Sequence, residues 1–169
     1  MTSIAFFEDR VWFGAAVPAA VNHYLQKAVE ARTRNRYEAE KLLWEARAED
    51  PTCLPVYFAL YKFYANARRL EAAERAALLA LAEASRQGGF PPDWRKLGRE
   101  PQRWSLYDSA AGLFYLFSLK ALGFIRLRRG HADKAKGVLD QLERLDPEDR
   151  CGGSVIRALA SSLDDGDQP

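Results

Sequence analysis

Cysteine and histidine are both scarce in this chain, which has two of each among its 169 residues. Cys53 and Cys151 are too few for a disulfide framework or an all-cysteine zinc site, and neither has a CxxC partner. His23 and His131 stand in no Ser/His/Asp or Cys/His motif, and the sequence holds no phosphate-loop, dinucleotide-binding or HExxH motif. These absences predict a protein that is not an enzyme, has no cofactor and no metal site, and resides in a reducing cytoplasm.

Long hydrophobic runs are also missing. The longest apolar stretch, 110–125, has 16 residues and contains Lys120, so it is shorter than the roughly 20 residues that a membrane span needs. The first residues, MTSIAFFEDR, have no basic region and place Glu8 and Asp9 directly after an apolar tetrad, unlike a secretory signal. We therefore expect no membrane span.

The net charge of +2 conceals a segregation along the chain. Residues 1–50 carry 7 basic and 8 acidic side chains, residues 51–130 carry 13 and 6, and residues 131–169 carry 5 and 9. A solvated surface explains part of this pattern. The excess of +7 in the middle also favours an acidic partner through long-range attraction.

Internal repetition is the strongest pattern in the sequence. The segments AEKLLWEARAEDP, AERAALLALAEAS and AKGVLDQLERLDP align with one another at intervals of 34 and 62 residues, so the second interval contains an insertion of 28. An apolar segment with helical periodicity precedes each of them, at about 19–33, 56–67 and 113–129. Each repeat is therefore predicted to be a helix–turn–helix, and the fold class to be all-α.

A 34-residue period of paired helices resembles the tetratricopeptide repeat. The third copy resembles it best: Leu122-Gly123, Gly130, Ala135, Leu139 and Pro147 stand where that family has its Leu-Gly pair, turn glycine, small residue, large apolar residue and closing proline. The first repeat has Gln26-Lys27 instead of Leu-Gly, and the second ends without a proline. The resemblance covers about 100 residues and implies three degenerate repeats.

This resemblance predicts one tetratricopeptide-like domain over residues 1–163. Its repeats span about 20–53, 54–87 and 116–149, with a basic insertion at about 86–107, a capping helix at 154–163 and a disordered tail at 164–169. Ile4 and the apolar residues up to Val17 are expected to cover the end of the first repeat or to form a dimer contact. The predicted state is therefore a monomer or a homodimer.

In the tetratricopeptide family, the first helices of the repeats line a concave groove that receives a peptide or a helix. The resemblance implies a non-enzymatic adaptor or chaperone-like assembly factor, like small bacterial proteins of this kind, with a protein or peptide partner. The basic and asparagine residues that bind chaperone C-termini in this family are not matched here. The implied groove is aromatic and basic, although its phenylalanines could equally pack the core: Tyr24, Phe58, Lys62, Asn66, Phe117, Lys120, Phe124 and Arg128.

The insertion offers an alternative function, because it interleaves aromatic and basic residues as single-stranded nucleic-acid platforms do. Nucleic acid is the less favoured partner, since the same rings could anchor the loop while its cations face solvent. The residues concerned are Trp94, Arg95, Lys96, Arg99 and Arg103. Cys151, which precedes the capping helix, is interpreted either as a small residue at a helix start or as a thiol whose pKa the helix dipole lowers.

Overall fold

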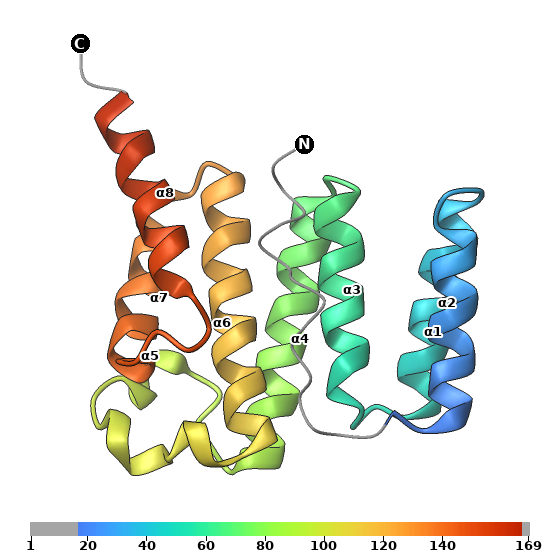
Figure 1. Ribbon diagram of the computed structural model, residues 1–169, viewed down its shortest axis with the longest axis horizontal. Coiled ribbons are helices and arrows are strands. Elements are labelled where there is room, and N and C mark those ends of the chain that lie inside the picture. Colours follow the sequence, from blue (N-terminus) through green and yellow to red (C-terminus); the bar gives the residue numbers. More distant parts are fainter. Residues whose placement is uncertain (1–16, 167–169) are drawn as a thin grey trace. The chain divides into compact units, whose positions relative to one another are not determined.

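The computed structural model describes residues 17–166, and every regular element within that range is a helix (Figure 1). The predicted all-α class is confirmed for this part of the chain, whereas the tetratricopeptide arrangement in particular stays a prediction. In chain order the elements are α1 (Ala19–Ala31), α2 (Arg36–Glu49), α3 (Leu54–Asn66), α4 (Leu70–Gly88), α5 (Trp94–Leu97), η1 (Pro101–Trp104), η2 (Leu106–Asp108), α6 (Ala110–Arg128), α7 (Ala132–Leu145) and α8 (Gly153–Gly166).

The chain divides within α4 into two compact units, the first ending at Ala80 and the second beginning at Leu81. The single domain predicted over 1–163 stays a prediction.

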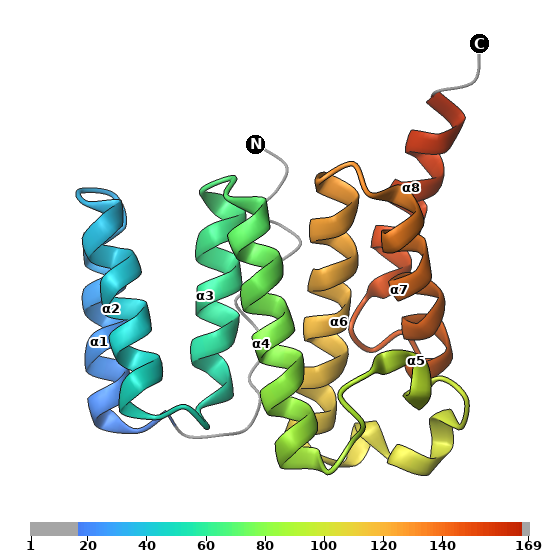
Figure 2. The same cartoon turned by 180° about the vertical axis from the view of Figure 1, so that it is seen from behind.

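In the first unit, α1 packs against α2 through small side chains. Ala28 and Ala31 on α1 and Ala39 and Ala46 on α2 are all at most 4% exposed, and alanine lets two helix axes approach closely. Asn35 starts α2, because its side-chain oxygen accepts hydrogen bonds from the next free backbone N–H groups, as an N-cap does. The same unit contains α3 and the start of α4, which lie side by side in Figures 1 and 2.

In the second unit, α6 is the core helix and packs against α7, α8 and η2. Figure 2 shows α6 beside α7. Gly123 permits this approach, because a Cβ atom added there would lie 2.9 Å from Cδ2 of Leu139 and 3.6 Å from Cγ1 of Val138. The Leu-Gly pair noted in the sequence therefore lies where two helices meet.

The inserted segment contains three short helices and is not an irregular loop throughout. Within it, α5 and the two short 3₁₀ helices η1 and η2 follow one another, and Phe90, Leu97 and Leu106 are buried. Phe90 lies edge-on to both Trp104 and Tyr115, with ring centroids 6.4 and 5.8 Å apart. The aromatic side chains thus hold the insertion against α6.

The two ends of the chain differ from the predictions in different ways. The last helix, α8, continues to Gly166, so residues 164–166 are helical rather than disordered, because the helix carries on beyond its apolar residues. Residues 167–169 lie outside the described part. The apolar segment from Ile4 onwards, with the predicted covering or dimer contact, also lies outside it except for Val17.

Candidate protein-binding surfaces

The predicted groove residues of the first unit lie mostly on one line of α3. Phe58, Lys62 and Asn66 recur every four residues, whereas Tyr57, Leu60, Tyr61 and Tyr64 turn to the buried side. Phe58 and Lys62 are half-buried, and the Lys62 ammonium lies 5.6 Å from the centroid of the Phe58 ring. Asn66 is exposed, and Tyr24 is half-buried on α1, edge-on to His23. The structure thus brings Phe58 and Lys62 together as one aromatic and cationic pair.

In the second unit the predicted residues lie on α6. Phe117 and Lys120 are half-buried, Arg128 is exposed, and Phe124 is only 4% exposed. Lys120 and Phe124 share one helix face because they are four residues apart. The α3 residues belong to the first unit and the α6 residues to the second, so one groove running along both stays a prediction.

A polar network that sequence inspection missed fastens α2 to α3 and to the start of α4. The Trp44 indole N–H donates to the Tyr64 hydroxyl at 2.8 Å, and this hydroxyl donates to Glu40 at 2.7 Å. Arg69 donates to the other Glu40 oxygen at 2.6 Å. Burial would raise the pKa of the Glu40 carboxyl, but the hydrogen bonds from Arg69 and Tyr64 outweigh it and hold that pKa below its usual value.

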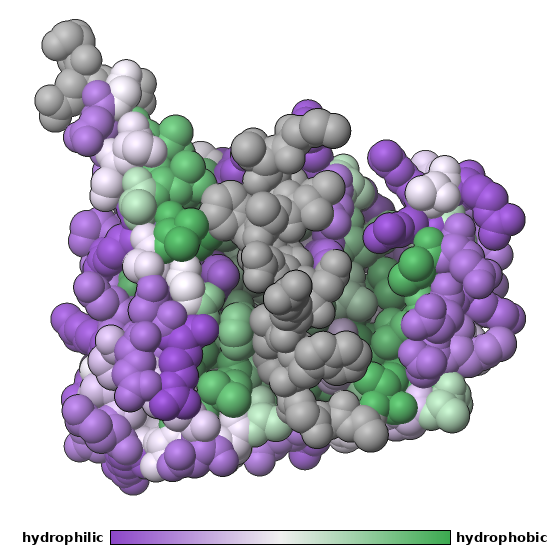
Figure 3. Space-filling view, in the orientation of Figure 1, coloured by the Kyte–Doolittle hydropathy of each residue, from purple (hydrophilic) through white to green (hydrophobic). Residues whose placement is uncertain are grey.

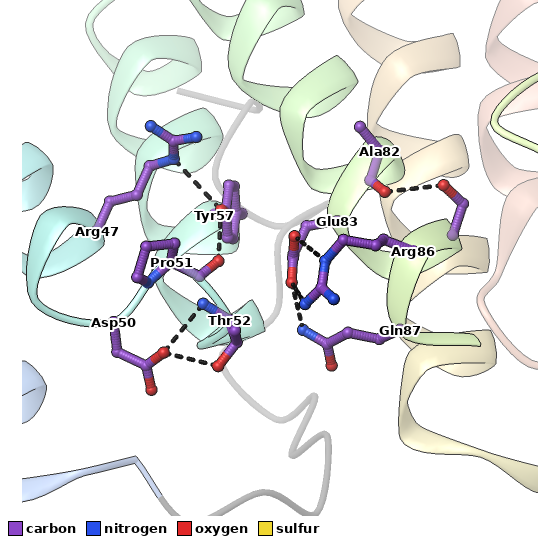
Figure 4. Close-up of polar contacts among 10 residues, drawn as sticks. Arg47, Asp50, Pro51, Thr52, Tyr57, Ala82, Glu83, Arg86 and Gln87 are labelled. Atoms are coloured by element: carbon purple, nitrogen blue, oxygen red, sulfur yellow. Dashed lines mark hydrogen bonds and ion pairs between the residues drawn. The ribbon is translucent and has the colours of Figure 1, made fainter. Parts of the chain in front are cut away.

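A second contact joins the end of α2 to α3 (Figure 4). The Arg47 guanidinium donates to the Tyr57 hydroxyl at 3.3 Å, and that hydroxyl donates to the Pro51 carbonyl at 2.6 Å. Arg47 also lies over the rings of Trp44 and Tyr57, at 5.6 and 5.5 Å from their centroids. Together with the Glu40 network, this contact fixes which face α3 buries and hence which face carries Phe58 and Lys62.

In the insertion, acidic neighbours engage several of the basic side chains. Arg95 pairs with Asp93 at 2.9 Å, and Arg103 pairs with Glu100 at 3.1 Å. The Arg95 guanidinium holds the pKa of the Asp93 carboxyl below its usual value. Just before the insertion, Glu83 likewise accepts hydrogen bonds from Arg86 and Gln87 (Figure 4). Lys96 and Arg99 are exposed.

The rings of the insertion are covered by cations of the same unit. Arg103 lies 5.0 Å from the centroid of the Trp104 ring, and Arg126 of α6 lies 5.4 Å from that of Trp94. Both tryptophans are half-buried. These contacts favour the interpretation in which the rings anchor the insertion. They fit less well with the alternative, in which the rings form an open platform for stacked bases.

Cys151 lies in a buried polar cluster at the turn between α7 and α8. Burial, together with the neighbouring Asp146 carboxylate, raises the pKa of the Cys151 thiol. The interpretation in which the dipole of α8 lowers this pKa is therefore wrong, because the thiol is 3% exposed and faces a negative charge. Burial also raises the pKa of Cys53.

Within 17–166, no group of three or more His, Cys, Asp or Glu side chains could hold a metal ion. His23 is exposed, and His131 is a half-buried residue at the start of α7. By length and hydropathy alone α6 could cross a membrane, but 67% of its apolar stretch is buried within the structure, as it is in a core helix.

The fold and these surfaces define an all-α protein of paired helices with aromatic and cationic side chains on α3 and α6. No family model and no solved structure matches the chain. It is similar to an uncharacterised 19.8 kDa protein of Azotobacter chroococcum mcd 1 whose gene lies in the 5′ region of nifW, with 31% identity over 120 residues, 70% of this chain and 67% of that protein. The chain belongs to the same family as that protein.

Proposed function

We propose that the protein is a non-enzymatic adaptor or chaperone-like assembly factor that binds a segment of another protein. The observation that carries this proposal is the pair of half-buried residues Phe58 and Lys62 on α3, whose ring centroid and ammonium are 5.6 Å apart. On α6, Phe117 and Lys120 are also half-buried and lie three residues apart. Partly buried rings supply contact area, and a neighbouring cation orients an acidic segment. We place the protein in the cytoplasm and expect it to act as a monomer or homodimer.

The gene of the related protein lies in the 5′ region of nifW. This position identifies no partner. The class of partner that we propose, a protein segment with apolar and acidic residues, is inferred from the surfaces on α3 and α6.

Quantitative affinity capture with matched variants tests the proposal. The wild-type chain, the double variant Lys62→Glu with Lys120→Glu, and the control Lys134→Glu are each used as bait after nuclease treatment. Lys134 is exposed at the start of α7 and is not one of the predicted groove or insertion residues. We expect proteins retained by the wild type and the control to be lost from the double variant, because reversing both charges repels an acidic segment.

Two results would contradict the proposal. One is a set of captured proteins that is identical for all three baits. The other is material that is captured only without nuclease and is lost when Lys96 and Arg99 are replaced by glutamate, which would identify nucleic acid bound by the insertion as the ligand.

A further inference from the structure

One edge of the first unit gathers arginine side chains around an exposed aromatic ring. Tyr37, in the first turn of α2, is 85% exposed, which makes it the most exposed large apolar side chain of the described residues. Arg34 and Arg36 shortly precede it and are exposed as well. Together with Arg68 and Arg69 of the turn between α3 and α4, these residues define the arginine–tyrosine edge.

An ion pair brings the second turn to this edge. Arg69 pairs with Glu40 of α2 at 2.6 Å. Glu40 follows Tyr37 by three residues and Arg36 by four, so the three side chains share one face of α2. Figures 1 and 2 show the α1–α2 and α3–α4 turns at the same end of the helices of the first unit, and Figure 3 shows hydrophilic surface at both turns.

Arg68 holds a backbone conformation that glycine adopts more easily. Its φ is 58°, in the left-handed region, whereas in the turn between α6 and α7 the residue with positive φ is Gly130, at 78°. A side chain of L configuration is strained in this region. An arginine kept at a position that suits glycine points to a role for its exposed side chain.

The positive charges of the edge are only partly neutralised within the chain. Elsewhere exposed arginines have a carboxylate partner close in sequence, as Arg75 has in Glu71 at 3.0 Å. Among the described residues, by contrast, no carboxylate forms an ion pair with Arg34, Arg36 or Arg68. The edge therefore presents guanidinium groups that can bind carboxylates of another molecule.

Nearby glutamates do not cancel this charge. Glu40 is already paired with Arg69. Glu30 and Glu38 are exposed, but they lie on the outer sides of α1 and α2, away from the faces that these helices bury. The edge thus joins four guanidinium groups to one carboxylate and has an excess of positive charge.

We propose that the arginine–tyrosine edge binds an acidic segment of a protein partner, with a large apolar residue of that segment against the Tyr37 ring and carboxylates on both sides of it at the arginines. Guanidinium groups bind carboxylates through two parallel hydrogen bonds. Protein interfaces enrich tyrosine and arginine and deplete lysine, as this edge does. Single-stranded nucleic acid is less favoured, because its platforms stack successive bases on several rings and this edge has one.

This inference rests on the proposed function as a protein-binding module, and it gives that function a further surface and a partner chemistry. The edge shares no residue with the predicted groove on α3 and α6. The two ideas can therefore fail separately. The capture experiment with the Lys62 and Lys120 variants tests the groove, and the peptides below test the edge.

Three synthetic peptides serve as probes of the full chain. The first is a fluorescein-labelled peptide of about nine residues with a central phenylalanine between two pairs of glutamates. The second has glutamine for every glutamate, and the third has serine for the phenylalanine. By fluorescence anisotropy at low salt, we expect the first peptide to bind about tenfold more tightly than the second and about threefold more tightly than the third. Its binding should weaken as salt is raised.

Variants of the edge locate this binding. We expect Arg34→Glu with Arg36→Glu to weaken binding of the first peptide by about tenfold or more, and Tyr37→Ser by about threefold. The double variant Lys134→Glu with Arg144→Glu is the matched control, because it reverses two exposed charges on α7 of the other unit. We expect the control to bind as the wild type does.

A glycine variant separates a binding role of Arg68 from a structural one. Arg68→Gly should bind the first peptide about threefold more weakly than the wild type does. Its melting temperature should equal or exceed that of the wild type, because glycine adopts a positive φ without strain. A residue that served only the fold would show the opposite pattern, a lower melting temperature with unchanged binding.

Four outcomes would overturn the proposal. They are equal binding of the first and second peptides, equal loss of binding in the α7 control, tighter binding of an oligothymidylate of about ten nucleotides than of the first peptide, and a dimer in sedimentation that Arg36→Glu dissociates. The third result would assign the edge to nucleic acid, and the fourth would assign it to a second copy of the chain.

Discussion

Tyr107 of the insertion donates its hydroxyl hydrogen bond to the buried carboxylate of Asp146, 39 residues further along the chain at the end of α7. The same hydroxyl accepts a hydrogen bond from the Glu148 N–H at 3.1 Å, and the Arg150 guanidinium lies 4.0 Å from the Tyr107 ring centroid. Asp146 also accepts the backbone N–H groups of Arg150 and Cys151, both at 2.9 Å. One carboxylate therefore joins η2 to the turn that leads into α8.

The first prediction concerns this joint. Tyr107→Phe removes the hydroxyl that donates to a charged acceptor, and we expect the second unit to lose about 1.5–3 kcal/mol of stability. Urea unfolding followed by circular dichroism measures the loss. Tyr37→Phe is the control, because Tyr37 is 85% exposed. Equal midpoints for the two variants would show that the hydrogen bond contributes nothing.

The second prediction concerns acid stability. Burial would raise the pKa of Asp146, but hydrogen bonds from the Cys151 thiol, the Tyr107 hydroxyl and two backbone N–H groups hold it below its usual value. A carboxyl with a lower pKa in the folded state stabilises the fold above about pH 4, its pKa in the unfolded chain, and loses that contribution as the pH falls through the folded pKa. Asp146→Asn should therefore be less stable than the wild type at pH 7.

The same substitution should also flatten the acid limb of the stability curve. Below pH 4 the melting temperature of Asp146→Asn should fall less steeply than that of the wild type, because the titrating group is gone. Thermal melts between pH 7 and pH 3 provide the measurement. Asp133→Asn, an exposed change in the first turn of α7, is the control. Parallel curves for the wild type and Asp146→Asn would refute the assignment.

The helices could be predicted from the sequence because their signals are local. The alanines at 39, 73 and 135, which defined the repeats, are all 0% exposed, and the segments with helical periodicity are helices. Asn35, Ser109 and Asp93 begin helices by accepting backbone N–H groups, as their residue types indicate. Such signals depend only on neighbours within one or two turns.

The polar networks and the order of the insertion could not be predicted, because they join residues far apart in the chain. Tyr107 and Asp146 form a pair only after the insertion folds back on α7, and Glu40 meets Arg69 only after three helices have packed. The exposure of Val155 and Leu163 was equally hidden. A fully buried cap and a helix that keeps one flank open would have the same five apolar residues on α8, which are Val155, Ile156, Leu159, Ala160 and Leu163.

The third prediction concerns the Glu40 network in the first unit. Tyr64→Phe removes an acceptor from Trp44 and a donor from Glu40 at a position that is 3% exposed. We expect a loss of about 1–3 kcal/mol, because both groups keep their burial and lose a partner. Hydrogen exchange should show faster exchange in α2 and α3 and unchanged exchange in α7. An equal increase of the exchange rates in both units would contradict a local role for the network.

The fourth prediction concerns the anchoring of the insertion. Phe90→Ala removes the ring that lies against Trp104 and Tyr115, and we expect trypsin then to cleave at Arg95, Lys96 or Arg99 before any other interior site. The wild-type insertion should resist, since Leu97 and Leu106 are buried. Phe63→Ala, a change in a half-buried ring on α3, is the control for general loosening. Early cleavage of the wild type at these sites would show that the anchoring is weak.

The fifth prediction compares two glycines inside the paired helices α6 and α7. A Cβ atom on Gly137 of α7 would meet nothing within 4 Å, so Gly137→Ala should stabilise the protein by about 0.5–1 kcal/mol through helix propensity alone. The same change at Gly123 of α6 brings the same propensity gain, but its Cβ would lie 2.9 Å from Leu139 Cδ2 and 3.1 Å from Leu139 Cγ. Leu139 is 3% exposed and must shift within a packed interface, which costs about 1–3 kcal/mol. The Gly123→Ala variant should therefore melt at a lower temperature than the Gly137→Ala variant in calorimetry.

The variant Leu139→Ala locates this cost. If the contact with Leu139 causes it, Gly123→Ala should lower the melting temperature less in the Leu139→Ala background than in the wild type. Equal gains for both glycines would mean that α6 and α7 pack less closely than the structure shows.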